Sequence, residues 1–382
     1  MNGLSEQLSQ HPLLQAIEKA LPELDRSLET PSADVLPDAA VALLRRTGVF
    51  RMALATDLGG MQTDPLVQLR AVESLAEHDA SLGWYAMIGS DSGYYASFLD
   101  PRVAAEMYAD DPDAITAGFV EPAGTALRTG DGYTVSGRWP FGSASKHARW
   151  LASGCRVRDG EQAGRWIVAL LPRTDCTVDE DSWHALGLQG SGSFSYAAHE
   201  ALVPRERTFS FDRPLSSDPL YRCPVMYRAK VPGVVLGTAR GAVREFTSLL
   251  ESGLEPGSGR PRRESPALQK ALGQAIARTT AARSYAYDTV GDLWDTVQAG
   301  TLPGTEQRAA FRIMLAHVMD VCREVALSLF RAASGGAVHD RHPLQRRLRD
   351  MLTATQHALG NERTYEHVGA ALVGLPAPEG TL

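Results

Sequence analysis

Four long helical patterns fill the chain from residue 226 onward, and they constrain the fold more than any other feature of the sequence. Segments rich in glycine and proline, which end helices, separate these patterns. At 1.5 Å per residue the patterns correspond to helices of ~40 to 50 Å, a length typical of helix bundles. We therefore predict a C-terminal four-helix bundle over 226–382, with helices at roughly 228–253, 265–299, 305–333 and 342–372.

Two other kinds of pattern precede the bundle. Residues 1–112 carry mostly helical signals, for example where Asp64 and Pro65 suit a helix cap and first turn. From 113 to 225, short apolar runs alternate with Gly, Asp and Pro turns, which favours an antiparallel sheet or small β-barrel. The predicted fold is α+β and mainly α, with an N-terminal helical domain, a middle β-barrel domain and the C-terminal bundle.

Composition excludes several classes of protein. A net charge of -7 over 382 residues argues against nucleic-acid binding, which needs a clustered basic surface. No apolar run approaches the ~18 residues of a membrane helix, and the N-terminus lacks a signal-peptide pattern. The widely spaced Cys155, Cys176, Cys223 and Cys322 show no metal-ligand spacing. We expect free thiols, no metal, no membrane partner and a cytoplasmic location.

The segment GRWPFGSASKHARW, residues 137–150, combines spaced aromatics with small hydroxyl residues. Trp139, Phe141, Ser143 and Ser145 alternate, so an extended strand would present them on one face. From spacing alone, an aromatic strand packed into a core is the simpler interpretation. A face that meets a flat ring is the alternative.

The order of the three segments, together with four local motifs, resembles the acyl-CoA dehydrogenase fold over nearly the whole chain. The motifs are ITAGFVEPAGTA at 115–126, the strand at 137–150, GLQGSGSFSYAAHEALVP at 187–204 and SGGAVHDRHPLQRRLRD at 334–350. In many members of this superfamily a glutamate soon after the last motif is the catalytic base. Here that place falls at His357 or Ala358, and the nearest acids are Glu362 and Glu366.

A histidine at this place is typical of the flavin-dependent monooxygenases in the superfamily, and WPFGSAS and TATQH also resemble their sequences. The chain is identified as a member of that branch. The resemblance implies that a separate reductase supplies reduced FMN or FAD, which reacts with O₂ to a C4a-hydroperoxide. This adduct then hydroxylates a small organic substrate. The resemblance also implies a homotetramer, built as a dimer of dimers.

The resemblance assigns roles to individual residues. His357 and Ser143 would be catalytic, and Trp84, Ser92 and His357 would contact substrate. Ser92 stands where several aromatic hydroxylases carry a histidine. The implied flavin contacts are Trp139, Phe141, Gly142, Ser143, Ser145, Trp183, Arg260, Arg263, Gly335 and Gly336. Helical periodicity adds that His357 should lie on the polar face of the last helix. There it could accept a proton or donate a hydrogen bond.

Several alternatives stay open. The chain could be an acyl-CoA dehydrogenase with tightly bound FAD and a relocated base. It could also be a non-enzymatic scaffold, whose flavin site would be blocked by side chains. No GxGxxG lies between a strand and a helix, so nicotinamide binding is not expected. The arginine runs at 260–263 and 341–349 fit either solvated helix ends or sites for an anionic ligand.

Overall fold

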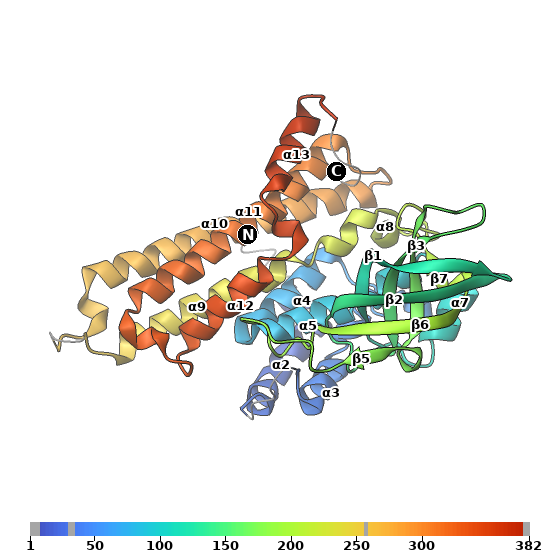
Figure 1. Ribbon diagram of the computed structural model, residues 1–382. Helices are drawn as coiled ribbons and strands as arrows, with labels where there is room; N and C mark the ends of the chain where they lie inside the picture. Colours follow the sequence, from blue (N-terminus) through green and yellow to red (C-terminus); the bar gives the residue numbers. More distant parts are fainter. Residues whose placement is uncertain (1–7, 30–34, 256–258, 377–382) are drawn as a thin grey trace.

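The computed structural model describes residues 8–29, 35–255 and 259–376, and within them the chain is mostly helical with one sheet at its side (Figure 1). N-terminal helices, the sheet and the long C-terminal helices follow one another along the chain. The helices are α2 (Pro12–Ser27), α3 (Asp38–Thr47), α4 (Pro65–His78), α5 (Ala80–Gly89), α6 (Ser92–Ala96), α7 (Pro101–Tyr108), α8 (Pro219–Arg222), α9 (Pro232–Ser252), α10 (Pro266–Gln298), α11 (Thr305–Ala332), α12 (Pro343–Ala354) and α13 (Arg363–Leu372).

The sheet has seven strands in the order β5-β6-β2-β1-β3-β4-β7. They are β1 (Thr116–Thr129), β2 (Gly132–Gly142), β3 (Trp150–Val157), β4 (Trp166–Pro172), β5 (Thr177–Asp179), β6 (Phe194–Pro204) and β7 (Thr208–Phe209). Two predictions need correction. In the described residues, β5 and β7 remain as edges and no hydrogen bonds join them into a barrel. In addition, β1 and β3 are parallel, because the segment after β2 crosses to the other side of β1 before β3 begins.

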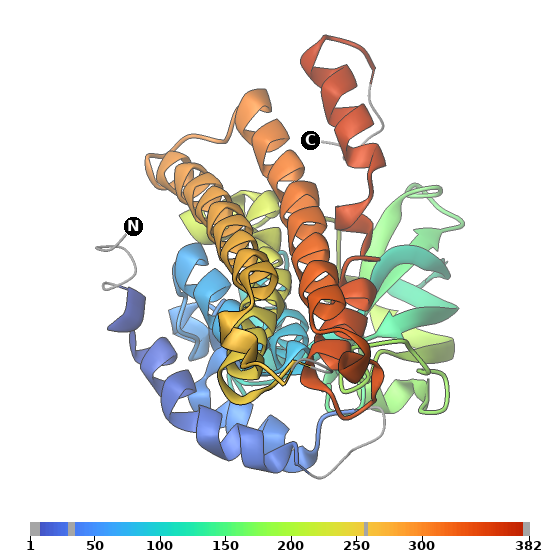
Figure 2. The same cartoon turned by 90° about the vertical axis from the view of Figure 1, so that its left-hand side faces the viewer.

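Three of the four predicted bundle helices are confirmed as α9, α10 and α11. The fourth, predicted over 342–372, is wrong: it is divided into α12, a 3₁₀ turn (Ala358–Gly360) and α13. Gly360 packs against α11, where a Cβ atom would lie 2.6 Å from the Met319 sulfur. Asn361 then accepts a hydrogen bond from the Arg363 amide at 2.9 Å and begins a new helix. As a result, α13 stands apart from α12 (Figures 1 and 2).

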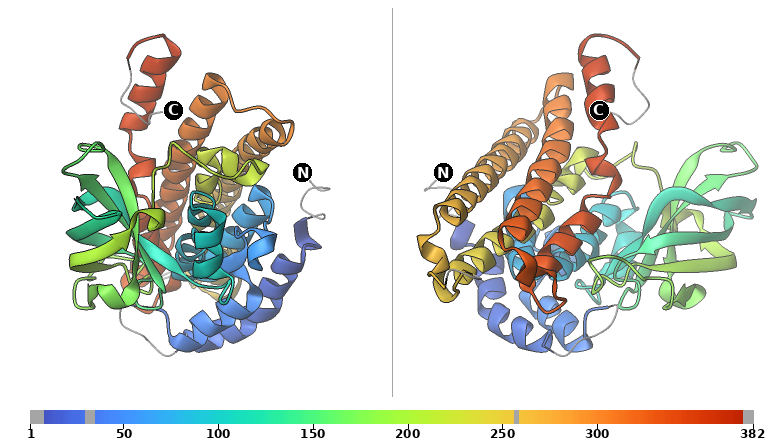
Figure 3. Two further views of the ribbon diagram at one scale, coloured as in Figure 1. Left: turned by 90° about the vertical axis from the view of Figure 1, so that its right-hand side faces the viewer. Right: turned by 60° about the vertical axis from the view of Figure 1, so that its left-hand side comes forward.

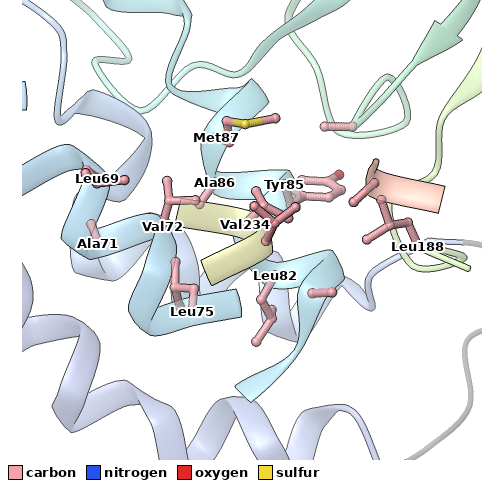
Figure 4. Packing of buried hydrophobic residues seen from close by; sticks show 14 of the residues in the cluster. Leu69, Ala71, Val72, Leu75, Leu82, Tyr85, Ala86, Met87, Leu188 and Val234 are labelled. Atoms are coloured by element: carbon pink, nitrogen blue, oxygen red, sulfur yellow. The ribbon is translucent and has the colours of Figure 1, made fainter. Parts of the chain in front are cut away.

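Helices α4 and α9 pack closely against each other. Gly237 and Gly241 lie on one face of α9, and a Cβ at Gly237 would be 2.2 Å from the Glu73 carbonyl oxygen. Only glycine therefore allows this approach. Figure 4 shows Val234 of α9 among apolar side chains of α4 and α5. This apolar cluster extends through the N-terminal helices, the sheet and the bundle, so the three segments share one core.

The sheet and the bundle lie on different sides of α4 and α5, whereas α2 and α3 cover the lower edge (Figure 3). All four cysteines are buried free thiols, as the sequence predicts. Across the described residues, none of the helices combines the length and apolar character needed to cross a bilayer.

A buried carboxylate fastens α4 to the bundle. Glu73 is fully buried and accepts hydrogen bonds from Arg283 Nε at 2.7 Å and from the Tyr287 hydroxyl. Arg70 and Arg240 add ion pairs at 3.3 and 3.6 Å. Burial alone would raise the pKa of Glu73, but the nearby arginine charges outweigh it and lower the pKa below its usual value.

Replacing Glu73 by Gln should lower the free energy of unfolding by ~3 to 5 kcal/mol, because the substitution leaves buried guanidinium groups without their carboxylate. Urea unfolding followed by circular dichroism measures the change. The matched control is Glu106→Gln, which removes an exposed i,i+4 pair with Arg102 and should cost less than ~1 kcal/mol. Equal effects of the two substitutions would contradict this role for Glu73.

Candidate active site

The site is assembled by the way α12 docks. Arg347 donates to three successive carbonyl oxygens at the end of α4: Ala76 at 3.0 Å, Glu77 at 2.8 Å and His78 at 2.7 Å. It also pairs with Glu245 of α9 at 2.9 Å. The last carbonyls of a helix have no partners within that helix, so Arg347 supplies donors that α4 itself lacks, together with Arg244, which also donates to the Glu77 carbonyl at 2.9 Å. This arginine therefore has a structural role and is not a free ligand site.

Two neighbours of Arg347 attach α12 to other segments. Arg346 pairs with Asp79, the carboxylate that caps α5. Asp350 accepts a hydrogen bond from the Leu188 amide at 2.7 Å. Burial and the charge of Asp79 raise the pKa of Asp350 to about 6. A Cβ at Gly187 would lie 2.3 Å from the α12 backbone, so only glycine fits there. Helix α12 is thus fixed to α5 and to the segment before β6.

The prediction that the alternating side chains of residues 139–145 share one face of a strand is wrong, because β2 ends at Gly142. Phe141 and Ala144 have φ angles of 57° and 64°, and Ala144 N donates to Ser191 O at 3.0 Å. Trp139 is fully buried, stacks on Tyr196 and donates to a β3 carbonyl, whereas Phe141 is 59% exposed. Trp139 is therefore a core residue, although the resemblance placed it at the flavin.

Ser143 lies within a chain of hydrogen-bonded polar groups, between Trp84 and Ser193. Trp84 Nε1 of α5 donates to Ser143 Oγ at 2.9 Å. Ser143 Oγ is 2.7 Å from Ser193 Oγ, which is 2.7 Å from Ser191 Oγ. An indole N–H can only donate, so Ser143 must accept from Trp84. When Ser193 also donates to Ser143, the Ser143 hydroxyl proton is available to a bound molecule.

Ser191 and Ser193 were missed by the sequence reasoning. Their alternation in SGSF at 191–194 was the available signal, since it places both side chains on one side of the chain.

His357 lies beside Trp84, not on an exposed helix face. Helix α12 ends at Ala354, so the predicted helical periodicity does not reach His357. The two rings meet edge to face with centroids 5.8 Å apart. The Leu359 amide donates to His357 Nδ1 at 3.3 Å, which assigns the proton of the neutral ring to Nε2. Burial and, next, the charge of Arg228 lower the pKa of His357 to about 4. The side chain is thus a neutral hydrogen-bond donor near pH 7.

An exposed aromatic surface borders this cluster. The Phe141 ring lies 6.3 Å from Phe119 and 6.4 Å from Trp183, and Trp183 is held by a hydrogen bond to the Leu188 carbonyl at 3.2 Å. In the adjacent loop, Ser145 Oγ is buried and has no hydrogen-bond partner among the described residues. Flat apolar surface edged by hydroxyls fits the ring of a flavin. Gly142 has no room for a side chain, because β6 occupies that space.

Other predicted residues lie elsewhere. Ser92 Oγ is buried, contacts Ala114 O at 2.7 Å and accepts from Thr116 N at 3.0 Å, which ties α6 to β1. Arg260 and Arg263 lie in the segment between α9 and α10. Gly335 and Gly336 lie between α11 and α12. Figure 1 shows both segments at the end of the bundle away from the sheet. Within a single subunit, the two arginines and the glycine pair therefore do not lie beside Ser143.

The acids considered as substitutes for a dehydrogenase base are not in this cluster. Glu362 and Glu366 are exposed and begin α13. In the described part of the chain, no carboxylate is hydrogen-bonded to Trp84, Ser143 or His357. The polar groups that meet here are an indole N–H, hydroxyls and a neutral imidazole.

Comparison with known proteins identifies the class. The family described as acyl-CoA dehydrogenase, C-terminal domain, matches residues 231–362. The chain is 30% identical to indole-3-acetate monooxygenase of Acinetobacter baumannii, over 88% of this chain and 87% of that protein. It is 27% identical to the flavin-dependent monooxygenase oxygenase subunit HsaA of Mycobacterium tuberculosis, over 97% and 98% of the two chains.

Solved structures agree in fold. The HsaA crystal structure from Mycobacterium tuberculosis aligns with a TM-score of 0.89 at 25% identity, covering 97% of this chain and 99% of that chain. XiaF from Streptomyces, solved with FADH₂ and glycerol, aligns with a TM-score of 0.91 at 24% identity, covering 100% and 99%.

The chain belongs to the flavin-dependent monooxygenases of the acyl-CoA dehydrogenase superfamily. It is an oxidoreductase that uses reduced flavin and O₂ to hydroxylate a small substrate.

The neutral state of His357 can be tested directly. Its pKa of about 4 lies below the ordinary value near 6.5, so the folded protein binds this proton more weakly than the unfolded chain. The contribution to stability is therefore complete above pH 6.5 and is lost as the pH falls toward 4. NMR titration, with the signal assigned by His357→Asn, should give a midpoint near 4. A midpoint near 6.5 would contradict the burial of this ring.

Proposed function

We propose that this protein is the oxygenase component of a two-component system that hydroxylates a small aromatic substrate. A separate reductase would supply reduced FMN or FAD. The observation that carries the proposal is the meeting of Ser143, Trp84 and His357 beside the exposed Phe141 surface. The names of relatives support a separate reductase, since these proteins are called oxygenase subunits or components. The buried free thiols suit a reducing cytoplasm.

The overall reaction balances as a monooxygenation. Reduced flavin supplies two electrons, one atom of O₂ replaces the hydrogen of a substrate C–H bond as hydroxyl, and the other atom leaves as water. The bound flavin supplies the oxygen-activating chemistry. The chain itself supplies position, hydrogen bonds and protection from water.

Each residue has a defined part in this proposal. Phe141 and Trp183 would provide the aromatic surface that holds the flavin. Ser143, held by Trp84 and Ser193, would offer its hydroxyl to the bound cofactor. His357 donates a hydrogen bond from Nε2, because Nδ1 already accepts from the Leu359 amide. A neutral donor stabilises oxygen that becomes more negative during reaction and does not itself need to change charge.

The Trp84 indole and the His357 ring also favour an aromatic substrate. The two rings meet edge to face, and a flat substrate placed against them would gain apolar and aromatic contacts. Indole-3-acetate and resorcinol appear in the names of relatives, and both are aromatic. Ser92 is assigned no direct role, since its hydroxyl is occupied by α6 and β1.

We further propose a homotetramer in which a neighbouring subunit completes the cofactor site. The segment between α9 and α10, with Arg260 and Arg263, and the segment between α11 and α12, with Gly335 and Gly336, lie at the end of the bundle away from their own sheet (Figure 1). In a dimer of dimers this end would approach a neighbour, where the two arginines could hold the flavin phosphate.

The two rival functions have less support. An acyl-CoA dehydrogenase needs a carboxylate near the flavin, and both candidate acids on α13 are exposed. A scaffold protein would have its flavin surface blocked by side chains, but Phe141 is open to solvent.

Wild-type protein mixed with chemically reduced FMN or FAD should delay the return of oxidised-flavin absorbance after addition of O₂. Ser143→Ala should shorten this delay roughly tenfold, the effect of losing one hydrogen bond of ~1.4 kcal/mol. Stopped-flow absorbance measures the rate.

Ser136→Ala is the matched control, because Ser136 lies in β2, shortly before the turn that carries Ser143, and its hydroxyl bonds only the Glu200 amide among the described residues. Its delay should equal that of wild type. If wild-type protein itself causes no delay with either flavin, the oxygenase proposal fails.

A further inference from the structure

A tight turn, residues 142–147, carries Ser143 away from β2, and backbone hydrogen bonds hold its shape. The Ser145 amide donates to the Gly142 carbonyl at 3.0 Å, and the His147 amide donates to the carbonyl three residues before it at 3.1 Å. The two links overlap and join the turn into one unit. The position of Ser143 therefore depends on what attaches this turn to the rest of the protein.

Two consecutive residues of α5 hold the turn near its two ends. Trp84 Nε1 donates to Ser143 Oγ at 2.9 Å, near the start of the turn. The Tyr85 hydroxyl is 2.5 Å from His147 Nδ1, at the end of the turn, and the two rings meet edge to face with centroids 6.0 Å apart. A turn held by one hydrogen bond could rotate about it. The second attachment therefore fixes how Ser143 is presented to Trp84.

The ring of His147 is held at both nitrogens. Its Nε2 is 2.8 Å from Asp38 Oδ1 at the start of α3, and this hydrogen bond lowers the pKa of the Asp38 carboxyl. An ionised carboxylate can only accept, so Nε2 carries a proton and Nδ1 of the neutral ring accepts from Tyr85. Burial raises the pKa of the Tyr85 hydroxyl, which therefore keeps the proton that it donates. Because both nitrogens are engaged, His147 is not a ligand for a cofactor.

The bond with Tyr85 is the stronger part of this attachment. Tyr85 is fully buried and packs among the apolar side chains shown in Figure 4, and a buried hydroxyl that loses its partner costs free energy. In contrast, the Asp38 side chain is 92% exposed, so water screens its pair with His147. Asp38 mainly orients the ring, since it keeps the proton on Nε2 and leaves Nδ1 to Tyr85.

The turn is also tied to the segments around the sheet. The Ala144 amide donates to the Ser191 carbonyl at 3.0 Å, and Arg173 Nε donates to the Ser145 carbonyl at 3.2 Å. These bonds place the turn relative to the chain before β6 and after β4, but they do not reach α5. The His147 side chain supplies that link.

We infer that His147 is a positioning residue for the oxygenase reaction: through Tyr85 it fixes the turn against α5 and so keeps Ser143 at the Trp84 indole. The inference rests on the proposed function, because it concerns how Ser143 is held for the flavin. His147 acts through Ser143 and does not touch the reacting atoms.

The test removes the attachment without leaving a buried hydroxyl unpaired. The double variant His147→Leu with Tyr85→Phe replaces both polar partners together. The conservative variant is His147→Asn, because the amide oxygen can take the place of Nδ1 and accept from Tyr85. The control is His199→Leu, since the His199 side chain is 90% exposed on β6.

The first measurement needs no flavin. Hydrogen exchange of the Trp84 indole N–H, followed by NMR in protein with ¹⁵N-labelled tryptophan and assigned by Trp84→Phe, reports how firmly Trp84 is bonded to Ser143. The double variant should speed this exchange ~10-fold, whereas the conservative variant and the control should stay near wild type. The Trp139 indole donates to the Gly154 carbonyl at 2.8 Å and should be unchanged. No change at Trp84, or an equal change at Trp139, would overturn the inference.

The second measurement connects the attachment to the reaction. In the flavin reoxidation assay with FMN or FAD, the double variant should shorten the delay ~3- to 10-fold. Adding Ser143→Ala should shorten it no further than Ser143→Ala alone, because both changes act through one hydroxyl. Effects that multiply would contradict a role through Ser143. A wild-type protein that causes no delay would refute the proposed function, whereas the exchange of Trp84 would still test the attachment by itself.

Discussion

The docking of α12 through Arg346, Arg347 and Asp350 is the interaction on which the rest of the site depends. Arg347 closes the carbonyl end of α4, Arg346 pairs with the cap of α5, and Asp350 holds the segment before β6. These partners come from two separate parts of the chain, residues 76–79 and Leu188. Because the contacts fix α12 relative to α5, they also determine that His357, just beyond the helix end, meets Trp84.

The polar cluster works through donors whose direction is fixed. Trp84 donates its N–H to Ser143, and His357 Nδ1 accepts from the Leu359 amide. The Ser143 hydroxyl and the His357 Nε2–H are therefore the donors left for a bound molecule. Burial keeps the imidazole neutral, so this part of the site carries no charge of its own.

Much of the fold follows from local patterns. Long periodic segments predicted α9, α10 and α11, because helices of this length repeat the same apolar spacing over many turns. The prediction of a single last helix over 342–372 was wrong, because the interruption depends on Gly360 packing against Met319, which is distant in sequence. The strand at 137–150 was only partly right, since positive φ angles at Phe141 and Ala144 end the alternation that placed four side chains on one face. Trp139 then joins the core and Phe141 becomes exposed.

The sequence by itself determined the succession of helices, sheet and bundle, and through motif resemblance it selected Ser143, Trp84 and His357. Local periodicity and turn residues carry that information, since they act between neighbours in the chain. Only the tertiary structure decided that these three side chains meet and that Ser191 and Ser193 support them. Such facts depend on contacts between residues far apart in sequence, and these contacts form only when the helices pack against the sheet.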